Sequence, residues 1–417
     1  MREVCVVGAG VVGITTAWYL AEAGWRVTLL DKSATVGMGT SFQNGGQLSY
    51  RYVAPLADGG VPLKALKWLT EKDGPLRFKP SADMSQWSWL GKFLMRCHGQ
   101  ANRETTARLA RLGTYSRQCL QQLTESSKLP DFDWKESGKL IVYRTQATFD
   151  RAAGGALVKG VQSVLSADEC IAKEPVLGAL QGQIKGGIFT SDEAVADCHG
   201  FCEALMGVLA THPNFAGYAN EEVERFELDA NGKLRLLTNM GVRGSDAFVL
   251  ASGIASRRLA ATLQMNLPLY PLKGYSLTAP IGASHTPPQS SITDFERKVL
   301  YARIGDSLRV AAMVDMVGEN DTIEPGRIES LLRVARADMP HAGDYAQATT
   351  WAGLRPATPD GAPIVGPSSV PGLWLNVGHG PLGFTFACGT ASILASLMGQ
   401  GHSPLPLDGF TWPQKNQ

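Results

Sequence analysis

The segment 4–31 decides the fold, and it reads VCVV, GAGVVG, ITTAWYLAEAG and WRVTLLD in succession. A short β-branched run, a glycine-rich turn, a helix-length segment and a second apolar run follow one another without a gap. This order is typical of a βαβ unit, and the turn has the Gly-x-Gly-x-x-Gly spacing of dinucleotide-binding proteins. The sequence therefore predicts a Rossmann-like α/β domain that starts at its first strand.

Each part of this unit has a physical role. Gly8 permits a tight turn, Gly10 lets the backbone approach a pyrophosphate, and Gly13 allows the helix to pack closely on the strand. With Val12, these residues place helix N–H groups where a diphosphate is bound. Asp31 ends the second strand, where a carboxylate accepts hydrogen bonds from a ribose hydroxyl and disfavours a 2′-phosphate. At this point both FAD and NAD remain open.

The next segment favours FAD. Lys32 leads into residues 37–47, which are rich in glycine and uncharged donors instead of continuing the alternation of strands and helices. Such a loop can run beside a diphosphate and the polar edge of an isoalloxazine ring, although a plain solvent loop is the alternative. The predicted cofactor contacts here are Thr40, Ser41, Asn44, Gly45, Gly46 and Gln47.

Composition excludes several classes of protein. The 417 residues carry 39 Lys+Arg against 38 Asp+Glu, so no basic surface predicts nucleic-acid binding. Seven cysteines without a C-x-x-C pair argue against a disulfide framework, and we predict no metal site, including at Cys198 and Cys202. The apolar run at Val4 leaves no room for a signal peptide, and the uncharged stretch 361–407 is broken by prolines. We therefore predict a cytoplasmic protein with a buried C-terminal core.

Beyond the βαβ unit, further blocks along nearly the whole chain resemble the flavin-dependent D-amino acid dehydrogenases, within the glycine oxidase and sarcosine oxidase-like (DAO) family. These blocks are residues 40–47, 60–69, 270–278, 308–313, 351–361 and 378–385. The resemblance implies a discontinuous FAD-binding domain (1–80, 150–260 and 350–417) and an inserted α+β substrate-binding domain with a mixed or antiparallel sheet (81–149 and 261–349). We expect the FAD to be non-covalent, since Cys5 lies in a predicted strand and Cys388 in a predicted helix, and neither has an obvious route to the flavin ring.

Some positions depart from the family pattern. Tyr50 and Arg51 follow the loop where small or proline-friendly residues are expected, and Val310–Asp315 replaces a segment that more often contains glycines and an acid. We therefore expect Tyr50, Tyr52 and Asp315 to reshape the pocket. This changes which substrate is accepted and leaves the type of reaction the same.

Arg355 is the predicted anchor for a substrate carboxylate, because a guanidinium offers two parallel hydrogen bonds. It follows a predicted strand that Pro356 is expected to end. The alternative is a structural ion pair with Asp360 or Glu324. In related oxidases an arginine in the matching motif binds the substrate.

Glycines before the C-terminal helix (384–398) are predicted to present N–H groups to the flavin O2 and N1. The predicted contacts are Gly378, His379, Gly380, Leu382 and Gly383. His379 is also a candidate for substrate binding and catalysis, with a structural role as the alternative.

Four more residues complete the predicted site. Tyr275 lies in an alternating strand and is a candidate for carboxylate binding or pocket closure, with a half-buried sheet tyrosine as the alternative. Lys273 is a candidate to approach flavin N5 through a water. Tyr52 and Tyr301 are predicted to line the substrate pocket.

The expected activity is oxidative deamination of a D-amino acid, including D-proline or a hydroxy-D-proline, with hydride transfer from Cα to flavin N5 and electrons passed to a quinone or another carrier. Two alternatives stay open: an oxidase that uses oxygen on glycine, sarcosine or an amine, and an FAD-binding subunit of a hetero-oligomeric dehydrogenase. Trp68, Trp87 and Trp89 with Lys64, Lys67 and Lys92 suit peripheral membrane contact, while packing on the chain's own domain is the other interpretation.

Overall fold

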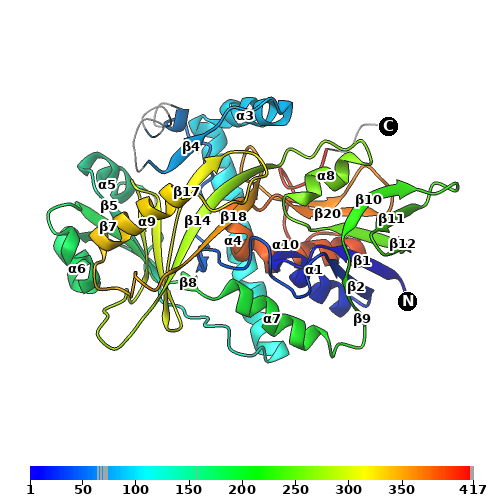
Figure 1. The fold of residues 1–417 in the computed structure, drawn as a ribbon, viewed down its shortest axis with the longest axis horizontal. Helices are drawn as coiled ribbons and strands as arrows, with labels where there is room; N and C mark the ends of the chain where they lie inside the picture. The colour runs from blue at the N-terminus through cyan, green and yellow to red at the C-terminus, as the bar shows by residue number, and fades with distance from the viewer. Residues whose placement is uncertain (63–64, 66–67, 69–73, 156, 414–417) are drawn as a thin grey trace.

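Two large β-sheets lie side by side in the computed structural model, and each carries its own helices (Figure 1). Two smaller sheets, of three strands and of two strands, accompany them among the described residues. The structure describes residues 1–62, 65, 68, 74–155 and 157–413. The sheet that contains β1 (Glu3–Val7) lies on the side of the two termini, and the sheet that contains β14 (Tyr270–Pro280) lies on the opposite side. This arrangement confirms the predicted α/β class with a second, largely antiparallel sheet.

The first sheet grows from the predicted βαβ unit. β1 pairs in parallel with β2 (Arg26–Asp31) and with β13 (Ala247–Leu250), and α1 (Val11–Glu22) connects β1 to β2. Among the described residues its strand order is β19 (Ile364–Pro367), β20 (Leu373–Val377), β13, β1, β2 and β9 (Phe215–Asn220). Within this sheet β19 is antiparallel to β20, while the other pairs are parallel.

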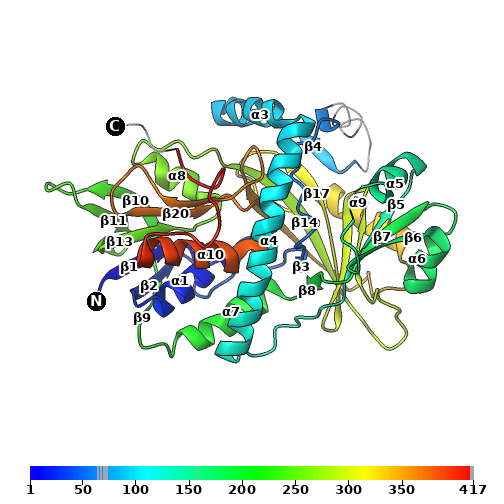
Figure 2. The same ribbon diagram turned by 180° about the vertical axis from the view of Figure 1, so that it is seen from behind.

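Helices α1, α4 (Gly99–Ser127) and α10 (Gly383–Gln400) form much of the core beside this sheet, and α7 (Cys198–Leu209) adds Phe201 and Leu205 to it. α10 packs against α1, and α4 crosses in front of α10 in the view of Figure 2. By length and composition the segment Gly380–Gln400 is apolar enough to cross a membrane, but 67% of its most apolar 18-residue window is buried inside the protein. The uncharged C-terminal stretch therefore forms part of the protein core, as predicted.

The second sheet carries the substrate side of the molecule. Its described strands run in the order β18 (Thr349–Ala357), β14, β17 (Ser307–Met316), β16 (Val299–Ile304), β15 (Ser291–Asp294), β5 (Lys139–Tyr143), β7 (Gly186–Thr190) and β6 (Gln162–Ser166), and β4 (Leu76–Phe78) also pairs with β17. The helix α9 (Pro325–Asp338) covers one face, where Leu331 and Ala335 pack against Tyr275 and Leu277.

The sheets divide the chain differently from the predicted domain ranges. β4, β6, β7 and β18 fall in ranges predicted for the FAD-binding domain, yet they pair within the second sheet. Conversely, α4 falls in a range predicted for the substrate domain, but its Leu109, Leu112 and Leu120 belong to the core around α1 and α10. The chain crosses between the two units more often than its motifs indicate.

The predicted end of β18 at Pro356 is wrong. The strand continues to Ala357, and Pro356 pairs with Pro271 of β14. β18 is an edge strand of the second sheet, so its outer side needs no N–H donor, and a proline is compatible with that position.

The remaining elements surround these layers. They are β3 (Gln47–Leu48), α3 (Met84–Arg96), α5 (Gln146–Ala153), α6 (Ala167–Lys173), η1 (Pro175–Leu180), β8 (Ala194–Val195), β10 (Val223–Leu228), β11 (Leu234–Thr238), β12 (Gly241–Gly244), α8 (Ala255–Ala261) and η2 (Gly380–Leu382).

Candidate active site

A cavity of about 1950 Å³ extends from the first sheet to the second. Its walls come from the β1–α1 turn, the segment 38–49, strands β14, β17 and β18, and the segment 376–384. The loop after β13 and the inner side of α3 also contribute. The cavity therefore reaches from the predicted dinucleotide turn to the predicted carboxylate anchor.

The β1–α1 turn has the geometry that its glycines predict. Gly8 adopts φ +106°, and a Cβ there would lie 2.6 Å from the Cα of Ser252. A Cβ on Gly13 would lie 1.7 Å from the carbonyl oxygen of Gly8, so the helix packs on the strand without room for a side chain. Gly10 and Val12 line the cavity, and the first turn of α1 offers N–H groups that have no partner within the helix.

The carboxylate of Asp31 lies at the end of β2, beside this turn. It accepts hydrogen bonds from the backbone N–H of Ala9 (2.8 Å) and of Ser33 (2.9 Å). Asp31 and Lys32 both line the cavity, at the end where the adenosine half of a dinucleotide would be held. The two backbone bonds fix the carboxylate, which keeps further acceptor capacity for a ribose hydroxyl.

The loop 40–47 is fixed from both sides. Ser41 Oγ accepts from the N–H of Val11 (3.0 Å), and Thr40 donates to the carbonyl of Leu354 in β18 (2.8 Å). Ser276 of β14 donates to the carbonyl of Gln43 (2.8 Å). Asn44 Oδ1 accepts from the N–H of Gly46, which stabilises the turn between them. The loop thus lies between the dinucleotide turn and the second sheet, and Asn44, Gly45 and Gly46 line the cavity.

A buried arginine also holds this loop and was not predicted. Arg309 of β17 donates to the carbonyl of Asn44, and burial lowers the pKa of its guanidinium. The sequence does contain a signal for this role, because a charged residue inside the apolar run of β17 needs a hydrogen-bond partner in the protein interior.

A second unpredicted group lies at the far end of the cavity. Lys139 of β5 is 3% exposed and donates to Gln47 Oε1 (3.0 Å) and Ser49 Oγ (2.7 Å), while its Nζ lies 4.6 Å from the ring centre of Tyr52. Burial lowers the pKa of Lys139 to about 8 and raises the pKa of nearby Glu193. Tyr52 lines the cavity as predicted, at this end.

The glycines before α10 adopt conformations that favour glycine, with φ +84° at Gly378 and φ +53° at Gly380. Leu382 and Gly383 lead into α10, and the whole segment lines the cavity. The N-terminal end of an uncharged helix therefore faces the cavity, where its N–H groups and dipole favour negative charge.

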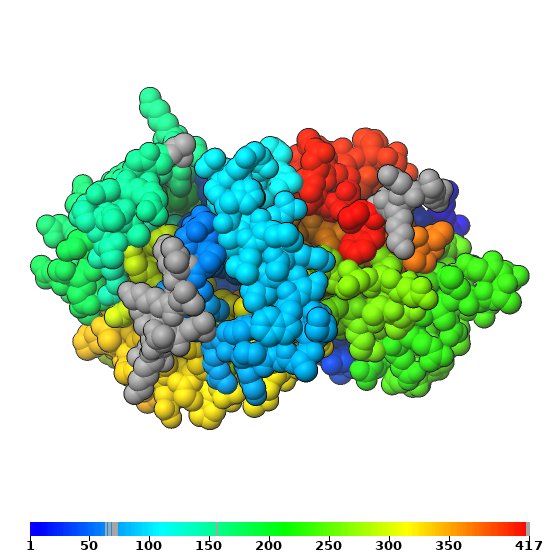
Figure 3. Space-filling view, turned by 90° about the horizontal axis from the view of Figure 1, so that it is seen from above, coloured from blue at the N-terminus to red at the C-terminus, as the bar shows by residue number. Residues whose placement is uncertain are grey.

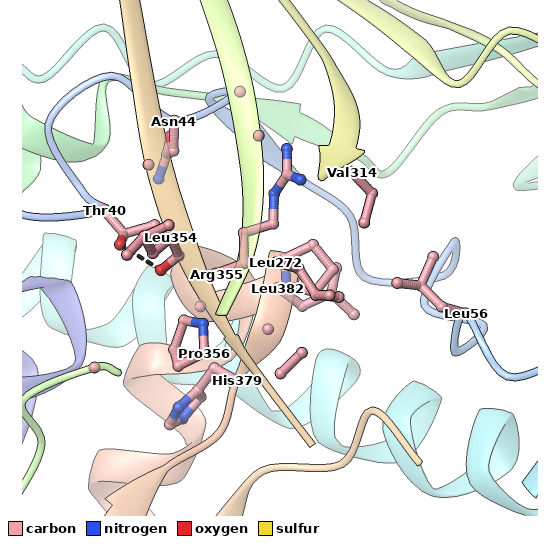
Figure 4. A pocket seen from close by; sticks show the side chains of 18 of the residues that line it. Thr40, Asn44, Leu56, Leu272, Val314, Leu354, Arg355, Pro356, His379 and Leu382 are labelled. Atoms are coloured by element: carbon pink, nitrogen blue, oxygen red, sulfur yellow. Dashed lines mark hydrogen bonds between the residues drawn. The ribbon is translucent and has the colours of Figure 1, made fainter. Parts of the chain in front are cut away.

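His379 does not support a catalytic or substrate-binding role. Its ring is 3% exposed, and Nε2 lies 3.0 Å from Thr390 Oγ1 of α10. Figure 4 shows the ring turned away from Arg355. Burial lowers the pKa of His379 to about 3, so the imidazole is neutral and structural, although the residue is part of the cavity wall.

Arg355 projects into the cavity from β18 (Figure 4). One Nη donates to the carbonyl of Met313 (2.9 Å), and the guanidinium lies so close over Gly274 that a Cβ there would be 2.1 Å from Nη2. Enclosure lowers the pKa of Arg355 to about 10, partly opposed by the charge of Asp315. Among the described residues, no carboxylate lies within 4.0 Å of this guanidinium.

The predicted alternative of a structural ion pair is wrong for Arg355. Glu324 pairs with Arg77 (3.5 Å), and Asp360 accepts from the N–H of Ala362 (3.2 Å). The remaining N–H groups of Arg355 are therefore available to a ligand in the cavity.

Tyr275 and Lys273 occupy the other face of the sheet. Arg355 pairs with Leu272 of β14 and shares its face, and because side chains alternate along a strand, Lys273 and Tyr275 point the opposite way. Tyr275 borders the cavity, but its hydroxyl donates to Asp315 (3.0 Å). Lys273 donates to the carbonyl of Thr322 (2.8 Å) and does not line the cavity. Their predicted catalytic and substrate-binding roles are corrected accordingly.

Tyr301 is also outside the site. It lies in β16, is 1% exposed, and its hydroxyl donates to Asp338 (3.1 Å) beneath α9. The residue is absent from the cavity wall, so its prediction as a substrate ligand is wrong. The alternating pattern of a strand does not indicate which of its two faces meets the cavity, so the sequence alone could not place the Tyr301 side chain.

Further cavity residues come from segments that the motifs did not indicate. Val223, Ala251, Ser252 and Gly253 line the dinucleotide end. The last three follow β13, the strand next to β1, and small residues at the carboxyl end of a parallel strand are a recognisable signal for a close backbone approach.

These features together suit a flavin dinucleotide. The fixed acid at the end of β2, the glycine-rich turn after β1, the loop 40–47 and the glycines before α10 all line this one cavity. They would hold the adenosine, the diphosphate and the isoalloxazine ring in that order. Cys5 and Cys388 are buried in β1 and α10 and do not line the cavity.

Comparison with known proteins agrees with this geometry. Residues 3–397 match the family described as FAD dependent oxidoreductase (DAO). The chain is 47% identical over 400 residues to D-amino acid dehydrogenase 2 of Pseudomonas aeruginosa, covering 96% of this chain and 95% of that protein. It is 38% identical over 421 residues to D-amino acid dehydrogenase of Vibrio cholerae serotype O1, covering 99% and 100%.

Solved structures share the fold at lower identity. Glycine oxidase from Geobacillus kaustophilus superposes with a TM-score of 0.72 at 21% identity over 100% of both chains. L-proline dehydrogenase from P. horikoshii superposes with a TM-score of 0.75 at 16% identity over 98% of this chain and 96% of that chain. By its sequence match across both sheets, the chain belongs to the family of FAD-dependent oxidoreductases.

Proposed function

We propose that this enzyme oxidises a D-amino acid with an uncharged side chain, and that Arg355 binds the substrate carboxylate. The observation that carries the proposal is an enclosed guanidinium in the cavity whose only described partner is a backbone carbonyl. FAD, when bound, supplies the acceptor for the hydride that leaves the substrate Cα. The chain itself has to hold the substrate, exclude water and favour the charge that develops on the ring.

The surroundings of Arg355 support this choice of substrate. Leu272 and Val314 lie near the Arg355 side chain, with Leu382 beside Leu272 and Leu56 further along the wall (Figure 4). Apolar walls exclude water and strengthen a carboxylate–guanidinium pair. They leave a second charge on the substrate side chain without a partner, so aliphatic substrates and cyclic ones such as proline fit best.

The configuration of the substrate rests on the relatives. Both dehydrogenases reported above carry a D-amino acid in their names, at 47% and 38% identity over almost the full chain. We therefore propose the D configuration for this chain, and a non-covalent FAD.

The proposal is tested by anaerobic titration of the yellow holoenzyme with matched D- and L-amino acids, including alanine, leucine, proline, glutamate and lysine. Bleaching of the flavin absorbance by D-alanine, D-leucine or D-proline, with weak response to the charged and L forms, is the expected result. If no amino acid bleaches the flavin, the chain is instead a cofactor-binding subunit, and the proposal is wrong.

We further propose that the electron acceptor is a membrane quinone and that α3 contacts the bilayer from the cytoplasmic side. α3 has no acidic residue, and its outward side exposes Met84, Trp87 and Met95 at 75%, 44% and 68%. Figure 3 shows this helix on the outside of the molecule. Lys92 and Arg96 flank the apolar stripe, as expected for an interfacial helix.

The other side of α3 supports the same acceptor. Leu90 and Phe93 line the cavity together with Leu56 and Trp68, and Leu94, which also lines it, is 48% exposed. This apolar part of the cavity wall would lie next to the proposed membrane surface. Trp89 is a correction to the sequence-based prediction, because it is 4% exposed and donates to the carbonyl of Ala357. Lys64 and Lys67 lie outside the described residues.

Co-sedimentation with phosphatidylcholine vesicles, with and without phosphatidylglycerol, tests the contact. Trp87→Ser with Met95→Ser should weaken binding, whereas Met240→Ser, at a residue 74% exposed on the distant β11–β12 turn, should not. Reduction of a soluble quinone during D-alanine oxidation, without matching oxygen uptake, is expected. Oxygen uptake equal to substrate consumption would favour the oxidase alternative.

A further inference from the structure

Strand β17 contains an irregularity next to Arg355. Tyr275 of β14 pairs with Ala312, but Lys273 pairs with Asp315. Between these pairs β14 has one residue, Gly274, while β17 has two, Met313 and Val314. This is a β-bulge, in which two residues of one strand oppose one residue of its neighbour.

The first bulge residue has a backbone conformation that favours glycine. Met313 adopts φ +72°, and it is one of five non-glycine residues with positive φ among those described. The other four, Lys128, Asp133, Gln264 and Lys298, lie at a helix end, in turns or in a loop. Met313 alone of these lies inside a strand, and it is 5% exposed. A strained residue that persists in a buried strand is held there by its surroundings, and such residues cluster at functional sites.

The bulge changes which face of the sheet receives Asp315. In a regular strand, residues 311, 313 and 315 would share one face, and Asp315 would stand opposite Leu272, on the face of Arg355. With the extra residue, Asp315 pairs with Lys273 and shares the face of Tyr275. There it accepts from Tyr275 (3.0 Å) and Arg327 (2.7 Å).

The bulge also supplies the one described partner of Arg355. The Met313 carbonyl accepts from its Nη at 2.9 Å, and the residue opposite, Gly274, leaves room for the guanidinium to lie over the strand. A neutral acceptor fixes the orientation of the guanidinium without neutralising its charge. The remaining N–H groups stay directed at the cavity.

We propose that the Met313–Val314 bulge is a positioning device for Arg355: it turns Asp315 to the opposite face and aims the Met313 carbonyl at the guanidinium. The substrate carboxylate is then the anion that Arg355 meets. This inference rests on the proposed role of Arg355, and Met313 acts through Arg355 without taking part in the reaction. It predicts that backbone conformation at residue 313, more than side-chain size, sets carboxylate affinity.

A substitution series at residue 313 tests the backbone argument. Met313→Gly and Met313→Asn keep a residue that tolerates positive φ, whereas Met313→Ile keeps an apolar side chain of similar size that does not. Stopped-flow reduction of the holoenzyme by D-alanine gives the dissociation constant and the limiting rate separately. We expect Met313→Ile to raise the dissociation constant about ten- to a hundredfold, as for loss of a charged hydrogen bond, with a smaller change in limiting rate. If Asn weakens binding more than Ile does, the proposal is wrong.

Leu272→Asp tests the claim that Arg355 stays free for substrate because the bulge keeps Asp315 off its face. Leu272 pairs with Arg355 and shares its face, and it stands opposite the position that Asp315 would take in a regular β17. A carboxylate at residue 272 should therefore neutralise Arg355 and weaken D-alanine binding about a hundredfold or more, whereas the uncharged control Leu272→Asn should weaken it far less. Equal losses in folded, FAD-loaded Leu272→Asp and Leu272→Asn contradict the proposal; if these variants do not fold, the substitution series at residue 313 decides. Arg355→Met separates the two ideas, since unchanged D-alanine binding in that variant would remove the anchor itself.

Discussion

Two arginines on opposite faces of the same sheet have opposite surroundings. Arg327 donates to Asp315 (2.7 Å) and to the carbonyl of Gly74 (2.9 Å), so its charge is neutralised inside the protein. Arg355 has the Met313 carbonyl and no described carboxylate within 4.0 Å. A paired buried charge holds a structure together, and an enclosed charge without a counter-ion favours an anionic ligand.

The largest expected effect concerns stability. Arg327→Met leaves the carboxylate of Asp315, 0% exposed, without its main counter-ion, and should lower the free energy of unfolding by about 3–5 kcal/mol. Thermal denaturation of the holoenzyme measures the change. The double variant Arg327→Met with Asp315→Leu should recover much of the loss, because an apolar pair can replace a buried ion pair. A fully stable Arg327→Met single variant would remove the contrast between the two arginines.

The next effect concerns substrate binding. Arg355→Met should lower kcat/KM for D-alanine by an amount equivalent to about 2–5 kcal/mol, mainly through KM, because the carboxylate loses its partner. The melting temperature should stay equal or rise, since an enclosed charge is removed. A large drop in melting temperature with an unchanged KM would place Arg355 with Arg327 as a structural residue.

A smaller loss is expected for Arg355→Lys. Lysine keeps the positive charge but lacks the planar fork that binds both carboxylate oxygens. The expected cost is about 1.5–3 kcal/mol in kcat/KM, and less than that of Arg355→Met. Steady-state kinetics of the two variants side by side give the share due to geometry. Equal losses in both variants would show that charge alone has no value in this site.

The smallest effect concerns the pH dependence of stability that the buried, neutral His379 causes. Its pKa in the folded protein is about 3, below the ordinary 6.5, so the unfolded chain binds a proton first as the pH falls. Stability from this residue is present above pH 6.5 and is lost toward pH 3. Between pH 7 and pH 5 the enzyme should lose about 2 kcal/mol that His379→Gln does not lose. Denaturant unfolding at both pH values checks this, and parallel losses would indicate a different titrating group.

The sequence predicted those parts of the molecule that depend on local pattern. The positions of Gly8, Gly13 and Asp31 were predicted correctly because the signals for strand, turn and helix follow one another within one short segment. The block 351–361 predicted that Arg355 follows a strand and faces a ligand, and Arg355 does line the cavity.

The errors arise where tertiary pairing decides. Lys273, Tyr275 and Tyr301 lie in correctly recognised strands, but which face meets the cavity depends on neighbours far away in the chain. One bulge in β17 places Asp315 on the face of Tyr275 instead of the face of Arg355, and no residue pattern predicts this bulge. Lys139 and Arg309 were missed because a lone cation in an apolar strand indicates that it has a buried partner but does not indicate which residue that partner is.

The bonds of the loop 40–47 have a mechanical consequence. Thr40 and Gln43 are joined to β18 and β14, while Ser41 is joined to α1, so one short segment ties both halves together. A hinge motion that separated the two large sheets would break these hydrogen bonds and distort the loop that is proposed to hold the flavin. Substrate exchange that leaves these three hydrogen bonds intact therefore leaves the two halves in the same relative position.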